Sequence, residues 1–107
     1  MTDVTVTKET HAEDTGRYVA RIAGIDGEGE LTFTPAGPGI ISANHTGVPE
    51  AMGGRGVARA MLDVLMQDAR SQGFRVIPRC SFVARQAARH PEWADLFTPP
   101  QGTVTPA

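Results

Sequence analysis

The sequence contains little cysteine and no long apolar run, and both absences exclude classes of protein. Cys80 is the single cysteine among 107 residues, so the chain has no internal disulfide and lacks the cysteine partners of a zinc knuckle. We accordingly expect no metal site. Apolar runs are only a few residues long, far below the roughly 20 residues that span a bilayer. The N-terminus, MTDVTVTKET, has neither the basic start nor the apolar segment of a signal peptide. We therefore expect a cytoplasmic protein without membrane contact.

Charge is distributed unevenly, although the formal net charge is only −2. Residues 1–50 carry eight acidic groups against three basic ones, a net of −5, and residues 51–107 carry seven arginines against four acids, a net of +3. The second half therefore suits a small polyphosphorylated ligand. The acidic whole argues against a general nucleic-acid binder.

Alternating apolar and polar residues predict strands in the first half of the chain. The pattern predicts strands at residues 17–22, 30–34 and 40–46, separated by glycine- and proline-containing turns at 26–29 and 35–39. These segments form a three-stranded antiparallel meander in our prediction. Residues 2–7 alternate threonine and valine, which is typical of an edge strand or a loose arm.

The second half changes to a helical period. Apolar residues from Val57 to Ala69 recur at three- and four-residue intervals, and Gly73 supplies the stop. A short strand follows at 74–80, and a second helix at 82–89 with Ser81 as its N-cap and an end before Pro91. A strand, a helix and a strand form one crossover, so the strand at 74–80 should lie parallel to that at 40–46.

These elements predict one α+β domain with a mixed, mostly antiparallel sheet and two helices. We place the domain at residues 1–97 and a flexible tail at 98–107. Met61 and Met66 are predicted to be core residues, and Trp93 and Phe97 to pack the C-terminal segment onto the sheet.

The stretch GVPEAMGGRGVA places glycines at 47, 53, 54 and 56 directly before the long helix. A loop that leaves a strand and opens a helix presents free N–H groups at the positive end of the helix dipole, which suits a pyrophosphate. Arg55 would add a charged clamp. The alternative is that the glycines only make the tight turn. The loop is neither a P-loop nor a dinucleotide fingerprint, whereas GGRG matches the GxxG clamp of RNA-binding KH domains.

Three motifs resemble the GCN5-related N-acetyltransferases and, within them, the short single-domain branch. They are Arg55-Gly56-Val57-Ala58 at the helix start, His45-Thr46-x-Val48-Pro49-Glu50 before it, and Val76-Ile77-Pro78-Arg79-Cys80-Ser81-Phe82-Val83 followed by Arg89-His90-Pro91-Glu92-Trp93. The resemblance implies a fold in which the strands ending near His45 and Cys80 splay apart to admit the pantetheine arm of acetyl-coenzyme A. The residues we expect to bind the cofactor are Val48, Gly53, Gly54, Arg55, Gly56, Val57, Ala58 and Arg59.

Two residues are candidates for catalysis. His45 could accept the proton of the amine, since its reference pKa lies near neutrality; the alternative is a strand-end histidine bonded to backbone. Cys80 could act as a transient acetyl acceptor, or it could be a small buried hydrophobe. The branch often has glutamate where this chain has Gly47, and tyrosine where it has Gln86.

The function we expect is therefore transfer of an acetyl group from acetyl-coenzyme A to an amine. The acceptor would be a protein lysine, a protein N-terminus or a polyamine, and the protein would be a monomer or a weak homodimer. Because Gly47 and Gln86 replace the glutamate and tyrosine of the branch, a second hypothesis is a non-catalytic module that senses coenzyme A. A third is a GxxG-type RNA-binding module, which the acidic composition disfavours.

Overall fold

The first half of the chain folds into four antiparallel strands. The computed structural model describes residues 4–11 and 15–98. The strands are β1 (Val4–Thr10), β2 (Gly16–Ile22), β3 (Gly29–Gly37) and β4 (Ile40–Gly47). Each is paired with the next along the chain. The meander predicted from the alternation is therefore confirmed, and the threonine–valine segment before it is an edge strand.

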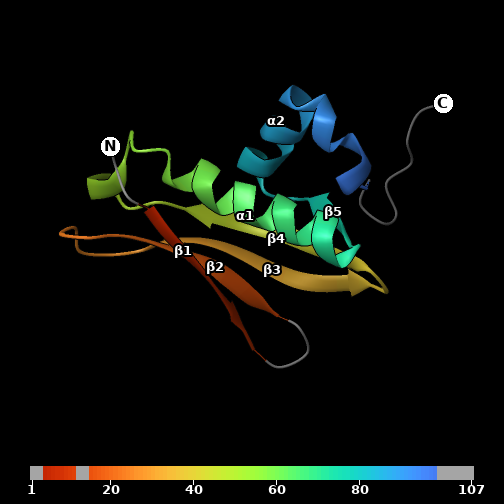
Figure 1. Cartoon of the computed structure of the whole chain (residues 1–107), viewed down its shortest axis with the longest axis horizontal. Coiled ribbons are helices and arrows are strands. Elements are labelled where there is room, and N and C mark those ends of the chain that lie inside the picture. Colours follow the sequence, from red (N-terminus) through yellow and green to blue (C-terminus); the bar gives the residue numbers. More distant parts are fainter. Residues whose placement is uncertain (1–3, 12–14, 99–107) are drawn as a thin grey trace.

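The second half supplies the helices and one parallel strand. Its elements are the 3-10 helix η2 (Glu50–Met52), α1 (Val57–Gln72), β5 (Arg75–Pro78), α2 (Ser81–Arg89) and the 3-10 helix η3 (Pro91–Leu96). Strand β5 pairs with β4 in parallel, so the sheet order is β1-β2-β3-β4-β5. Figure 1 shows the sheet as one layer with α1 lying across it. The mixed sheet and the crossover are as predicted.

The helix boundaries follow from local residues, with one correction. Gly73 ends α1 in the left-handed region at φ 79°, where its N–H bonds to Ala69 O at 2.9 Å. Ser81 was predicted to be the N-cap of the second helix, but it is the first helical residue. Cys80 is the N-cap, and it makes no side-chain capping bond. After β5 the chain turns at Pro78, where Arg79 N bonds to Ile77 O at 3.0 Å, and Cys80, with an extended backbone at φ −71° and ψ 132°, becomes the cap.

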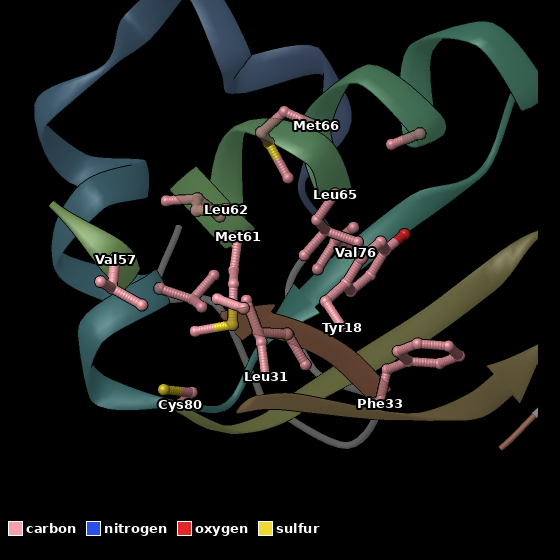
Figure 2. Packing of buried hydrophobic residues seen from close by; sticks show 14 of the residues in the cluster. Tyr18, Leu31, Phe33, Val57, Met61, Leu62, Leu65, Met66, Val76 and Cys80 are labelled. Carbon is pink, nitrogen blue, oxygen red and sulfur yellow. The ribbon is translucent and has the colours of Figure 1, made fainter. Parts of the chain in front are cut away.

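One face of α1 forms the core with the sheet. Met61, Leu62 and Leu65 are fully buried, and they pack toward Tyr18 and Leu31 of the sheet (Figure 2). Met66 is also buried, so both methionines are core residues as predicted. This packing fixes the direction of α1 and therefore the place of its N-terminus.

The C-terminal segment closes one edge of the sheet. Phe97 forms a parallel bridge with Val76 of β5, and Thr98 N donates to Val76 O at 3.0 Å. Trp93 and Phe97 are half-buried against the core, as predicted. Of the predicted tail, residues 99–107 lie outside the described part of the chain. None of the described helices is long and apolar enough to cross a membrane.

Candidate functional site

Strand β4 extends beyond its parallel neighbour. The pairing of β4 with β5 ends at Ala43 and Pro78, whereas β4 continues to Gly47. Cys80 N then donates to Ala43 O at 2.9 Å as the chain turns into α2. Within the described residues, positions 44–47 of β4 therefore have a strand neighbour only on the β3 side. The two strands lose contact here because β5 ends at Pro78.

The loop after β4 requires glycine at two positions. Gly54 and Gly56 adopt the left-handed region, at φ 74° and 72°, which other residues adopt only at a cost. Gly53 has an ordinary extended conformation, φ −62° and ψ 146°, and its N–H closes the preceding 3-10 turn on Glu50 O at 3.0 Å. The need for a tight turn thus accounts for two of the three glycines. Arg55 lies between them and is exposed.

The N-terminus of α1 is left without a side-chain cap. Gly56 is the N-cap, and the first intrahelical bond runs from Ala60 N to Gly56 O at 3.0 Å. The N–H groups of Val57, Ala58 and Arg59 precede that bond and are free of it. Three successive donors at the positive end of a 16-residue helix form an anion-binding arrangement. Because the cap residue is glycine, no side chain of the cap covers these N–H groups, and a ligand can approach them.

The two arginines near this loop have different surroundings. Arg59 bonds to Asp63 at 2.8 Å and to the ring of His90 at 3.3 Å, and its guanidinium carbon lies 5.0 Å from the Trp93 ring centre. Arg55 makes no ion pair or side-chain hydrogen bond within the described chain. Its guanidinium is therefore available to a ligand, whereas that of Arg59 is engaged with α2 and η3.

His90 links α1 to the C-terminal segment. Its Nε2 faces the guanidinium of Arg59, and its Nδ1 lies 2.9 Å from Oε2 of Glu92. Because a guanidinium only donates, Nε2 accepts and the proton sits on Nδ1. The pKa of Glu92 is lowered, first by its own backbone N–H and then by His90. The ring centres of His90 and Trp93 lie 4.6 Å apart, so the imidazole packs against the indole.

His45 lies on the part of β4 that extends beyond β5, where it pairs with Thr32 of β3, and is exposed. A Cβ atom placed on Gly47 would stand 3.1 Å from His45 Nε2. The imidazole therefore lies where the side chain of residue 47 would begin. Within the described residues its ring makes no hydrogen bond, so the expectation of a strand-end histidine tied to backbone is not what the structure shows.

Cys80 lies inside the core. It is 7% exposed and belongs to the main apolar cluster (Figure 2). Its thiol donates to Thr46 Oγ1 at 3.2 Å, which ties the start of α2 to the end of β4. His45 and Thr46 are adjacent in a strand, so their side chains point to opposite faces. The structure thus does not bring His45 and Cys80 together, and it matches the buried-hydrophobe alternative for Cys80.

Three surface hollows lie away from the glycine loop. The first, about 430 Å³, lies between α1 and Trp93, and the second, about 340 Å³, lies beside Phe33 and Phe74. The third, about 480 Å³, lies beside the turn after β2. The candidate site is instead an exposed loop beside a strand end. Among the described residues, no group of three side chains could hold a metal ion.

A mixed sheet with one β-α-β crossover, whose helix starts uncapped after a glycine loop, is the arrangement of an acetyltransferase fold. The model of the GCN5-related N-acetyl-transferase family matches residues 17–96, and the chain belongs to this family. A solution structure of a GCN5-like candidate N-acetyltransferase from Staphylococcus aureus shares the fold, with a TM-score of 0.64 and 20% identity over 90% of this chain and 91% of that one. No curated protein matches the sequence significantly.

Proposed function

We propose that the chain is an acetyl-coenzyme A-dependent N-acetyltransferase that passes the acetyl group directly to an amine. The observation that carries the proposal is the uncapped start of α1, with left-handed Gly54 and Gly56 around a free Arg55, after the end of β4 that extends beyond β5. Membership of the family supports the class of reaction. Acetyl-coenzyme A supplies an acetyl thioester.

The residues present fit a pyrophosphate. The N–H groups of Val57, Ala58 and Arg59 would donate to its oxygens, and Arg55 would add a charge-assisted bond. The side chain of Arg59 would instead position α1 against His90 and Trp93. The N–H of Val48, directly after β4, would polarise the thioester carbonyl. Gly53 would contribute no donor, because it has no side chain and its N–H bonds to Glu50 O at 3.0 Å.

We assign the general base to His45. Because residue 47 is glycine, the imidazole occupies the beginning of the space that a glutamate at 47 would enter. His45 is exposed and can release to solvent the proton that it takes from the amine. The nitrogen then bonds to the acetyl carbon, the carbon–sulfur bond breaks, and the second proton that the nitrogen loses passes to the departing thiolate. Cys80 has no part in this direct transfer.

The charge of the sheet supports a cationic acceptor. Thr32 of β3 pairs with His45 on one side and with Arg17 of β2 on the other. The guanidinium of Arg17 binds the carboxylates of Glu9, Glu28 and Glu30. Because Arg21 also binds Glu28, at 3.2 Å, the three carboxylates face two arginines, and one net negative charge remains beside His45. A protein lysine, a protein N-terminus or a polyamine matches that surface.

Calorimetry with acetyl-coenzyme A tests the binding site. Arg55→Ala should weaken binding by about five- to tenfold, as expected for loss of one charge-assisted contact. Arg75→Ala is the matched control, because Arg75 is also exposed and lies at the far end of β5, opposite Ile40. An affinity no better than millimolar, or equal effects of the two substitutions, would contradict the proposal.

Thiol release with a panel of amines tests the reaction. His45→Ala should lower kcat by roughly 10²-fold with little change in acetyl-coenzyme A affinity. Adding Gly47→Glu to this variant should restore part of the rate, since the carboxylate can then reach the space left by the imidazole. Tight binding without turnover on any amine would instead support the coenzyme A-sensing alternative.

A further inference from the structure

The two edge strands of the sheet, β5 and β1, differ in how their outer backbone groups are paired. At β5, Phe97 and Thr98 lie along Val76 and take one of its backbone acceptors. At the other edge, β1 pairs with β2 over all seven of its residues. None of the other described residues pairs with the outer side of β1. Unpaired backbone along a strand of this length is a template for another strand.

The hydrogen bonds of the β1–β2 hairpin show which backbone groups face outward. His11 N donates to Thr15 O at 2.6 Å, and the register continues from Thr10 opposite Gly16 without a bulge. Bonded and non-bonded pairs alternate in an antiparallel ladder. The residues at 5, 7 and 9 therefore bond to β2. Those whose N–H and C=O groups point outward are Val4, Val6, Lys8 and Thr10.

Strand β1 lacks the usual protections of an exposed edge. It contains no proline, glycine or bulge, and its first four residues, Val4 to Thr7, are all β-branched, which favours pairing. Its one lysine, Lys8, does not project over the outer edge, where a charge would oppose pairing with another strand. The Lys8 ammonium lies 5.5 Å from the ring centre of Phe33 and 4.0 Å from Asp68, which is over the face that carries α1.

We propose that β1 pairs with β1 of a second copy of this chain, antiparallel, to form a two-fold dimer with one continuous sheet. The axis passes between the two copies of Thr7. Val6 then bonds to Lys8 of the second copy and Val4 to Thr10, with up to about eight backbone hydrogen bonds across the edge. The inference does not depend on the proposed enzymatic activity.

The charges along β1 favour this register, and they favour a second copy of the chain as the partner strand. With Thr7 on the axis, Glu9 faces Thr5 and Lys8 faces Val6, so no two like charges stand opposite each other, and the two threonines form a favourable pair. Moving the axis by one residue to Lys8 places the two ammonium groups in direct opposition. With the axis at Val6, fewer of the residues Val4–Thr10 face one another. The strand is thus complementary to itself in one register that uses its whole length.

Sedimentation equilibrium of the full chain tests the dimer. The wild-type mass should rise with concentration from 11.4 kDa toward twice that value. Thr7 is exposed, and Thr7→Lys and Thr7→Glu each place like charges on the axis. Each should raise the dimer Kd by roughly fivefold or more. An equimolar mixture of the two variants should restore dimer formation, because opposite charges then meet on the axis.

Controls separate this edge from other surfaces. Ala84→Lys makes a similar charge change at an exposed position of α2 and should leave the dimer Kd unchanged. Val6→Pro removes an outward N–H without touching the bonds to β2, and should also weaken the dimer; if that variant fails to fold, the Thr7 pair still decides. A wild-type chain that stays monomeric up to about millimolar concentration overturns the proposal. So does a dimer that Thr7→Lys does not weaken, or strand addition by a foreign peptide in place of the second copy.

Discussion

The hydroxyl of Tyr18 ties the sheet to α1, and its removal should have a measurable cost. Tyr18 is fully buried (Figure 2), and its OH donates to Asp68 Oδ2 at 2.6 Å. The carboxylate has one further cationic neighbour, Lys8 at 4.0 Å. A hydrogen bond to a charged group contributes about 1.5–3 kcal/mol. The Asp68 side chain is 24% exposed and regains some water when the bond is lost, so we expect Tyr18→Phe to lower the free energy of unfolding by about 2 kcal/mol.

The same contact predicts an alkaline pH dependence. Burial, and then the Asp68 carboxylate, raise the pKa of Tyr18 far above its ordinary value of about 10. The unfolded chain therefore releases this proton first. The contribution of Tyr18 is fully present below pH 10, and it is lost as pH rises toward the folded pKa, by about 1.4 kcal/mol for each pH unit. The wild type and Tyr18→Phe should thus become equally stable near pH 11.5, about one and a half units above 10.

Urea unfolding of both proteins between neutral and alkaline pH measures this difference. Tyr18 is the single tyrosine of the chain, so tyrosinate absorbance reports its ionisation directly. The absorbance of the wild type should appear only as the protein unfolds. Equal stability of the two proteins at pH 7 would refute the reasoning, and so would reversible ionisation near pH 10 while the circular dichroism of the folded chain persists.

Three further substitutions test other parts of the structure. Leu65→Ala removes a fully buried side chain and should destabilise the chain by about 2–5 kcal/mol in urea unfolding. Gly56→Ala puts a Cβ on a left-handed residue at φ 72° and should cost about 1–2 kcal/mol in the same measurement, with weaker acetyl-coenzyme A binding in calorimetry. Glu92→Gln tests the pH dependence at acidic pH. Because the pKa of Glu92 is lowered in the folded chain, its carboxylate stabilises the fold above the ordinary pKa of glutamate, and this stabilisation is lost as pH falls through the lowered pKa. The difference between the wild type and this variant should therefore vanish in strongly acidic urea titrations.

Local patterns account for most of the fold that was predicted. Alternation in the first half and the helical period between Val57 and Ala69 depend on neighbours a few residues apart, so they are visible in the sequence. The parallel placement of β5 follows from the crossover rule. The N-cap of α2 was misplaced by one residue, because the backbone around Cys80 follows the end of β5 and not the preference of serine for a cap.

The candidate site was predicted in part. The glycine loop and Arg55 carry local signals, and the structure places them as an uncapped helix start. The engagement of Arg59 with His90 joins residues 31 positions apart, and no pattern in the sequence reports such a contact. The sequence therefore did not indicate that the side chain of Arg59, in the first turn of α1, is already engaged.

By itself, the sequence determined the strands, the helices and the place of the glycine loop, because hydrophobic period and glycine conformation are properties of short segments. Only the tertiary structure decided what the reactive side chains can reach. It placed Cys80 in the core against Thr46, left His45 exposed over Gly47, and joined Tyr18 to Asp68 across 50 residues. Burial and proximity of this kind depend on how α1 and the sheet pack together.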